Sequence, residues 1–379
     1  MTNDGMKPSA IGTGRAEKSH DLPGQVVLVL QGGGALGAFQ VGVYEALHDA
    51  GIEPDWVVGT SIGAINGAII AGNEPRQRMR RLREFWELVA SGADRYSPLS
   101  AFAPGQLFAN LSTMARGIPG FFTPNPRCWF GTAAPLGVTA ASFYTTTPLR
   151  ETLQGLVDFR HIGAAGTRLT LGAVNARSGQ MRYFDSREDT LTLDHIVASG
   201  ALPPAFPAIL IDGEPYWDGG VYSNTPIEVV MDDIRRRDSL IFATQLWQQN
   251  DNDPDSIDRV MSRLKDIQYS SRHSGQIARQ QQIHHLRHVV RELGKLLPEA
   301  EKARPEVQEL ISWGCGTVMH ILSLRAPRLD GEEGSKDIDF APDRVRARWD
   351  AGRRLAQSRI EEAPWKAAFD PVLGVVLYE

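Results

Sequence analysis

Residues 56–68 constrain the fold more than any other stretch, because they join a predicted strand to a predicted helix through a single serine. The apolar run at residues 56–58 leads into Gly59, Ser61 and Gly63, and small and apolar residues then continue at helical spacing. Gly-x-Ser-x-Gly is typical of a nucleophile elbow, in which glycines leave room for a strained serine above the sheet edge. The pattern also fits a plain tight turn with a solvated serine, so other motifs are needed to distinguish this turn from a nucleophile elbow.

A glycine-rich loop follows an earlier predicted strand. Residues 26–30 form the continuous apolar run expected of a buried strand in a parallel sheet. The loop glycines that follow are Gly32, Gly33, Gly34 and Gly37. Their spacing fits either a phosphate-binding dinucleotide loop or an oxyanion hole built from glycine N–H groups. A dinucleotide site needs an acidic residue after the second strand, and that position holds Ser61, so the sequence favours the oxyanion hole.

An Asp-Gly-Gly sequence ends another short predicted strand far downstream. A hairpin turn is predicted at residues 212–213, and the second strand of that hairpin leads to Asp218, Gly219 and Gly220. An aspartate before two glycines is by default a turn-forming residue. The neighbouring Trp217 permits desolvation, which would raise the pKa of the Asp218 carboxyl towards neutrality.

Composition indicates a globular protein whose overall charge balance gives no attraction to nucleic acid. The chain has 379 residues, 42% hydrophobic content and a formal net charge of −5. Its two cysteines do not form a disulfide framework, and no apolar segment approaches the length of a membrane span. Residues 1–25 are polar, lack an apolar signal-peptide core, and are expected to be a disordered leader. We therefore expect a cytoplasmic protein, with contact at a membrane surface left open.

The middle of the chain interrupts the regular pattern. Residues 97–147 combine many prolines with many aromatic residues and show neither a helical nor a strand period. Such a segment is typical of a lid or an acyl-binding wall beside an active site. A packed insertion whose aromatics fill a satellite core explains the pattern equally well.

Residues 247–379 are expected to form a mostly helical C-terminal extension. A long basic amphipathic helix is predicted over about 257–297, and it could lie on an anionic membrane or dock on its own domain. His284, His285 and His288 fall on this helix, but no nearby cysteine or acidic partner completes a metal site. They are interpreted as surface histidines, and neither a metal nor a cofactor is expected.

Together, the glycine loop, the serine elbow and the downstream Asp-Gly-Gly resemble the patatin-like phospholipases over residues 26–246. The extension resembles that of a bacterial subgroup of this family. The resemblance implies a three-layer α/β/α fold with a mainly parallel sheet. It also implies lipid acyl hydrolysis through an acyl-enzyme by a Ser–Asp dyad, with a lipid or other acyl ester as substrate.

Carried over by position, the resemblance makes Ser61 the nucleophile and Asp218 the base. It assigns the oxyanion hole to the N–H groups of Gly32, Gly33 and Gly34, and makes Gly37, Gly59, Gly63, Gly219 and Gly220 structural motif residues. The chain departs from the family at Leu36, where a basic residue is common, and at Gln31, where many members have Asp or Gly. Loss of the cation is expected to weaken oxyanion stabilisation or to change the preferred head group.

Two alternatives remain at this point. A Ser-His-Asp esterase would need a histidine after the acid, and His320 and the histidines between residues 273 and 288 lie downstream. They fall in the charged extension and not at the end of a strand. A non-catalytic lipid-binding or scaffold protein could keep the same fold, although the intact Ser61, Asp218 and glycine loop count against it.

Overall fold

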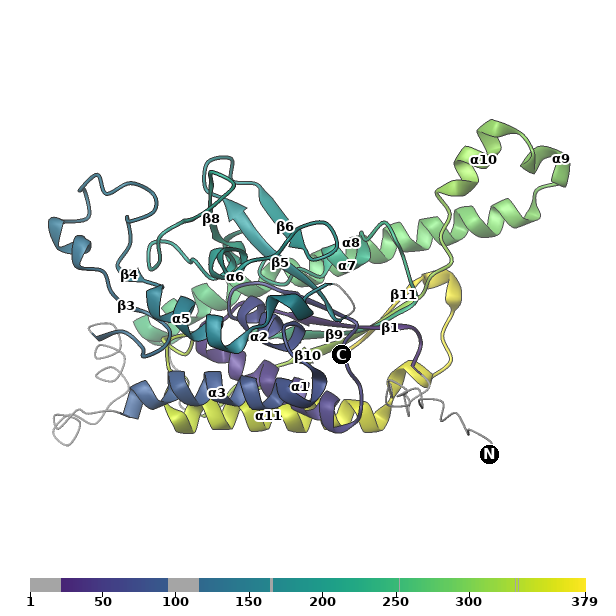
Figure 1. Ribbon diagram of the computed structural model, residues 1–379. Helices are drawn as coiled ribbons and strands as arrows, with labels where there is room; N and C mark the ends of the chain where they lie inside the picture. The colour runs from purple at the N-terminus through teal and green to yellow at the C-terminus, as the bar shows by residue number, and fades with distance from the viewer. Residues whose placement is uncertain (1–21, 95–115, 164–165, 252, 331, 333) are drawn as a thin grey trace, which may run out of the picture.

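The computed structural model describes residues 22–94, 116–163, 166–251, 253–330, 332 and 334–379 (Figure 1). Residues 1–21 of the expected leader and residues 97–115 of the irregular segment lie outside the described residues.

The centre of the molecule is a mainly parallel sheet, in which nine strands of the described residues take part. Their order is β11-β10-β9-β1-β2-β5-β8-β7, and β6 pairs with β5. Neighbours from β11 to β5 run parallel, whereas the pairs that involve β6, β7 or β8 are antiparallel. The strands are β1 (Gln25–Leu30), β2 (Trp56–Gly59), β5 (Arg168–Asn175), β6 (Met181–Asp185), β7 (Ile209–Ile211), β8 (Glu214–Asp218), β9 (Ser239–Gln245), β10 (Met319–Arg325) and β11 (Val375–Tyr378).

The apolar run of β1 is buried on both faces of the sheet, as the sequence predicts. Val26, Leu28 and Leu30 pack into the larger core cluster, which also takes in the helices on one side. Val27 and Val29 pack into a second cluster that includes residues of α7 and α8 on the other side. The expected three-layer α/β/α architecture with a mainly parallel sheet is therefore confirmed.

Helices cover the first face in a compact layer. Figure 1 shows α1, α3 and α11 running side by side beneath the sheet. Contact between α1 and α11 is very close, because a Cβ on Gly42 would lie 1.9 Å from the carbonyl oxygen of Trp349. The helices of this cluster are α1 (Ala38–Asp49), α2 (Ile62–Ala71), α3 (Pro75–Asp94), α5 (Thr147–Leu156), α6 (Leu193–Ser199) and α11 (Pro342–Glu362).

The second face is covered by α7 (Glu228–Met231) and α8 (Ile257–Leu296). The expected helical C-terminal region is present, and the end of α8 projects beyond the sheet with α9 (Glu299–Lys302) and α10 (Pro305–Ser312) (Figure 1). This region also contributes β10 and β11, so the sheet continues past residue 247. No helix in the described parts of the chain combines the length and the apolar character that crossing a bilayer would need.

The described part of the aromatic segment, residues 116–147, holds the short pair β3 (Thr123–Pro124) and β4 (Tyr144–Thr145) and a short 3-10 helix (Pro126–Phe130). Phe121, Phe122 and Tyr144 pack against one another and against Phe206. Several aromatics of the segment therefore turn inward, towards the carboxyl ends of the central strands.

Candidate active site

Ser61 occupies a strained turn between β2 and α2. Its backbone angles are φ 57° and ψ −125°, which a non-glycine residue adopts at a cost of roughly 1–3 kcal/mol. The turn is tight because a Cβ at Gly63 would lie 2.2 Å from the carbonyl oxygen of Leu30. The local geometry is therefore that of an elbow, which the Gly-x-Ser-x-Gly spacing predicts.

Ser199, at the end of α6, holds this turn in place. The Ser61 N–H donates to both the carbonyl oxygen and the hydroxyl oxygen of Ser199, at 3.2 and 3.1 Å. The Ser199 hydroxyl in turn donates to the carbonyl of Gly172 in β5, at 2.7 Å. The N–H of Ser61 is thus occupied, and the elbow is fixed to a neighbouring strand by a residue that sequence reasoning missed.

Replacement of Ser199 by alanine is expected to lower the free energy of unfolding by about 1–2 kcal/mol, because it removes one bond to the strained turn and one to Gly172. We expect kcat for the ester hydrolysis that the family resemblance implies to fall by up to about tenfold as Ser61 becomes less well positioned. Chemical denaturation and steady-state kinetics measure the two effects. Ser239→Ala is the matched control, since Ser239 is equally buried but lies at the opposite end of the sheet. Equal kcat losses in both variants would contradict the positioning role.

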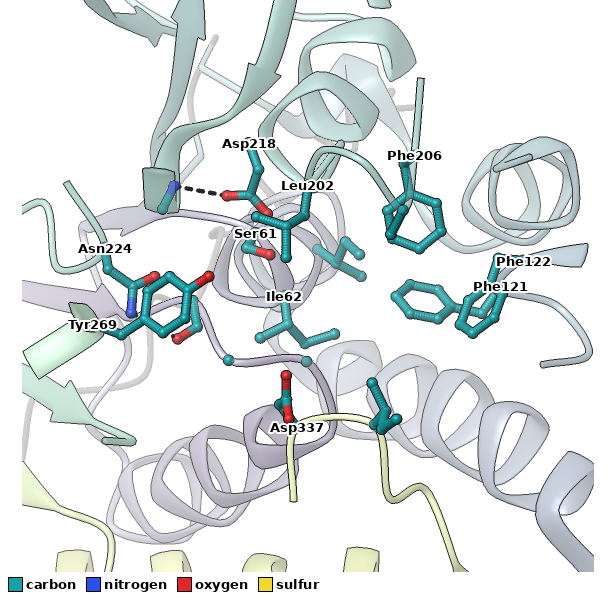
Figure 2. A pocket seen from close by; sticks show the side chains of 18 of the residues that line it. Ser61, Ile62, Phe121, Phe122, Leu202, Phe206, Asp218, Asn224, Tyr269 and Asp337 are labelled. Carbon is teal, nitrogen blue, oxygen red and sulfur yellow. Dashed lines mark hydrogen bonds between the residues drawn. The ribbon is translucent and has the colours of Figure 1, made fainter. Parts of the chain in front are cut away.

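Asp218 ends β8 and caps the short helical turn Gly219–Val221. Its side chain is buried, and its Oδ1 accepts a hydrogen bond from the N–H of Gly220, at 2.7 Å. Figure 2 shows the carboxylate next to the Ser61 side chain, within the same cavity. The sheet therefore brings the two predicted catalytic residues together, with no other labelled side chain between them in that view.

Burial raises the pKa of the Asp218 carboxyl from 3.8 to about 7. Hydrogen bonds from Ser61 and from the backbone of Gly220 stabilise the ionised form and offset part of this rise. A carboxylate with this pKa can both accept and return a proton near neutral pH.

The glycine loop requires one correction. Gly32 was expected to contribute its N–H to an oxyanion hole, but that N–H donates to the carbonyl of Asn224, at 3.1 Å. The carbonyl of Gly32 is also held, by the Asn224 amide at 3.0 Å and by the Trp247 indole at 2.8 Å. Gly32 therefore anchors the loop, and its amide is not free to bind an oxyanion.

Gly33 and Gly34 keep their amides available. Both line the cavity, and neither N–H has a hydrogen-bond partner among the described residues. The next amide, that of Ala35, donates to the carbonyl of Asp337, at 2.8 Å, which fixes the far side of the loop. Gly34 itself has a φ of +54°, and a Cβ there would meet the Asp337 carbonyl oxygen at 2.2 Å.

Ser61, Asp218 and the glycine loop line one cavity of about 210 Å³. Phe121, Phe122 and Phe206 lie on one side of Ser61 (Figure 2), and the ring of Phe340 packs on that of Phe121, so these four residues form an aromatic wall. Asn224, Tyr269 and Asp337 lie towards the glycine loop and the elbow (Figure 2), as does Trp247, whose indole donates to the Gly32 carbonyl. The cavity therefore joins an apolar compartment to a small polar one across the serine.

Five of the lining residues come from beyond residue 246: Trp247, Tyr269, Asp337, Ile338 and Phe340. No sequence motif marks them, and sequence reasoning missed all five. Lys265 of α8 pairs with the Asp337 carboxylate at 2.7 Å, so α8 also steadies the segment that contacts the glycine loop.

Leu36, the departure from the family's usual basic residue, is buried in the core cluster. It lines a separate small cleft with Phe39 and Leu246, and it is not among the described residues that line the cavity beside Ser61.

The described histidine side chains of the C-terminal extension lie outside the cavity. His284 and His288 are buried, contrary to the expectation of surface residues, because their rings bond the carbonyls of Met231 and Thr317. His285 contacts the carbonyl of Val372, and His320 contacts the Tyr378 hydroxyl. Among the described residues, no histidine lines the cavity, which disfavours the Ser-His-Asp alternative.

Comparison with known protein families gives matches to two regions of the chain, one before and one after residue 247. A model of the patatin-like phospholipases matches residues 28–231, which is more than half of the chain. A second model, described as patatin phospholipase, matches residues 267–372, within the C-terminal region.

Similarity to characterised sequences is local. Lysophospholipase nte1 of Aspergillus terreus is 63% identical over 46 residues, which is 12% of this chain and 3% of that protein. Patatin-like phospholipase domain-containing protein 7 of Rattus norvegicus is 44% identical over 88 residues, 22% of this chain and 6% of that protein. This chain thus spans only a few per cent of the length of these relatives. VipD from Legionella pneumophila aligns with a TM-score of 0.40 and 13% identity, over 94% of this chain and 72% of that one.

Proposed function

The chain belongs to the patatin-like phospholipase family, and from that membership we propose that it hydrolyses carboxylic esters of lipids, with Ser61 as nucleophile and Asp218 as base. One observation carries the proposal: a strained serine lies beside a buried aspartate (Figure 2), whose pKa burial raises to about 7. An ordinary aspartate, with a pKa of about 3.9, is a poor base at neutral pH. Burial removes that mismatch without a histidine.

In the first step, the Ser61 oxygen attacks the ester carbonyl while Asp218 accepts the hydroxyl proton. Negative charge develops on the carbonyl oxygen, and the N–H groups of Gly33 and Gly34 are the donors placed to receive it. Such donors are each worth about 3 kcal/mol to the transition state. The alcohol then leaves with the proton held by Asp218, and the acyl group remains on Ser61.

In the second step, water attacks the acyl-enzyme and Asp218 again takes and returns the proton. The same two amides stabilise the second tetrahedral intermediate. The free acid leaves, and Ser61 recovers its proton.

The aromatic wall suits the acyl chain of the substrate. Phe122 is buried, and its ring lies 5.5 Å from that of Phe206, centroid to centroid. An acyl chain packed on such rings would gain about 25 cal/mol for each Å² of apolar surface removed from water. We therefore place the acyl group on this side of Ser61.

Peripheral contact with a lipid surface is part of the proposal. The first part of α8 exposes Ile257, Val260, Met261 and Leu264, which occupy positions i, i+3, i+4 and i+7 of the helix. This spacing forms an apolar stripe on one face of the helix, the arrangement that interfacial helices present to a bilayer.

Two measurements test the function. The full chain should turn over members of a panel of acyl esters that includes phospholipids, lysophospholipids and neutral glycerolipids. A fluorophosphonate probe should label it at Ser61, as located by peptide mass spectrometry. Co-sedimentation with liposomes in the absence of turnover and labelling would instead support a lipid-binding protein without catalysis.

The pH dependence follows from the base. Asp218 must be ionised to accept the proton, and burial raises its pKa to about 7. Therefore kcat/KM for an uncharged ester should rise about tenfold per pH unit below pH 7 and level off above it. Values of kcat/KM measured on a short-chain nitrophenyl ester from pH 5 to 9 test for this rise and plateau. A profile already flat at pH 5 would show that the base is not this carboxyl.

A further inference from the structure

Tyr269 brings a phenol from α8 into the catalytic cavity. Its ring packs on Trp247, with centroids 4.8 Å apart and planes 33° apart. Its carbonyl accepts a hydrogen bond, at 3.3 Å, from the side chain of Gln31, the residue that opens the glycine loop. Both the ring and the backbone of Tyr269 are thus fixed to the loop that carries the oxyanion donors.

The hydroxyl of Tyr269 has no hydrogen-bond partner among the described residues and points into the cavity beside Asn224 (Figure 2). Burial, with the negative charges of Asp218 and Asp337, raises its pKa to about 12. The phenol therefore stays protonated in the pH range in which Asp218 ionises. It can act as a donor but not as a base.

Its place in the cavity indicates what it would donate to. In Figure 2, Tyr269 and the aromatic wall lie on opposite sides of Ser61. An ester whose acyl chain lies against Phe206, and whose carbonyl oxygen meets Gly33 and Gly34, directs its alcohol portion away from the wall. That direction leads to the Tyr269 hydroxyl.

We propose that Tyr269 is a further catalytic residue, whose hydroxyl donates a hydrogen bond to the alcohol oxygen of the bound ester as its C–O bond breaks. The inference rests on the proposed ester hydrolysis. The carbonyl re-forms as the C–O bond breaks, and the electron pair of that bond goes to the alcohol oxygen. The proton that Asp218 took from Ser61 passes to this oxygen, and Tyr269 keeps its own proton throughout.

A hydrogen-bond donor to the alcohol oxygen, in addition to Asp218, matters because a single carboxyl group serves both as base and as acid in this site. Charge builds up on the departing oxygen before Asp218 has delivered the proton, and a fixed donor stabilises that charge. The benefit is largest for an alkoxide, the leaving group of a glycerolipid. It is small for a nitrophenolate, which carries the charge without help.

Tyr269→Phe tests this difference, because phenylalanine keeps the ring that packs on Trp247 and removes only the hydroxyl. The substrates are nitrophenyl butyrate and ethyl butyrate, which share an acyl group. The readout is kcat/KM, which reports the acylation step in which the alcohol departs. We expect a loss of about 10- to 100-fold on the ethyl ester and less than about threefold on the nitrophenyl ester.

Three results would overturn the proposal: equal losses on both esters, no loss on either, or slowed fluorophosphonate labelling of Ser61 in the variant. The last would mean that the ring change disturbs the glycine loop. Tyr378→Phe is the control, since its phenol lies on β11 at the edge of the sheet and should affect neither ester. Failure of the proposed function itself looks different: the wild type would hydrolyse neither ester.

Discussion

Ser61→Ala is expected to lower kcat/KM for every ester that the protein hydrolyses by at least about 10³-fold, since loss of the nucleophile removes the covalent route. The residual rate enhancement of the variant would come from the glycine-loop donors and from substrate binding alone. The free energy of unfolding should change little, because alanine keeps the backbone bonds of the elbow to Ser199. Steady-state kinetics with purified protein, with circular dichroism as a check on folding, makes the measurement.

Ser91→Ala serves as the matched control for the nucleophile. Ser91 is an exposed serine on α3 whose hydroxyl bonds only the carbonyl of Leu88 among the described residues. This variant should retain wild-type activity and fluorophosphonate labelling. Full activity in Ser61→Ala would mean that another residue is the nucleophile.

Asp218→Asn is expected to reduce kcat/KM by about 10²- to 10⁴-fold, which is the usual contribution of a positioned general base. Asparagine has nearly the same shape and can still accept the hydrogen bond from Gly220, so the loss should reflect proton transfer and not collapse of the site. The rising limb near pH 7 should disappear from the residual activity of the variant.

The same substitution should stabilise the fold above neutral pH. The folded protein holds the Asp218 proton up to about pH 7, whereas the unfolded chain releases it near 3.8. The folded state binds more protons across this window, so stability falls as the pH rises through it. Three pKa units correspond to about 4 kcal/mol, which is the upper limit of the gain. We expect Asp218→Asn to raise the free energy of unfolding by about 1–4 kcal/mol at pH 8 and by little at pH 4.

Asp212→Asn is the control, because Asp212 lies in the turn of the same hairpin with a φ of 52°, which asparagine also tolerates. It should leave both activity and the pH dependence of stability unchanged. An Asp218→Asn variant that is less stable at pH 8, or that keeps full activity, would contradict the assignment of this carboxyl as a buried base.

The sequence predicted the parts of the site that depend on local backbone geometry. The elbow at Ser61 needs a small residue at Gly63, and the loop at Gly34 needs a positive φ, so both leave short glycine patterns. The strand β1 can be predicted from its unbroken apolar run, which arises because both of its faces are buried. Each of these signals is complete within a few residues.

The remainder of the site depends on contacts between distant parts of the chain. The donor capacity of Gly32 is decided by Asn224, 192 residues away, and the elbow is held by Ser199, 138 residues away. Tyr269 is an ordinary helix residue until the fold places it against Trp247. The pKa of Asp218 depends on burial, which the Asp-Gly-Gly sequence permits but does not determine. None of these contacts leaves a pattern in the sequence.

The pairing of β9 with β10 has a consequence beyond the chemistry. β10 bonds β9 along its whole length, from Ser239 to Gln245, and β11 follows on the outside. A fragment that ended near residue 247 would leave β9 as a bare edge, with unpaired N–H and C=O groups and apolar side chains on both faces. Such an edge is a template for intermolecular pairing and aggregation. The C-terminal strands therefore also protect the protein against self-association.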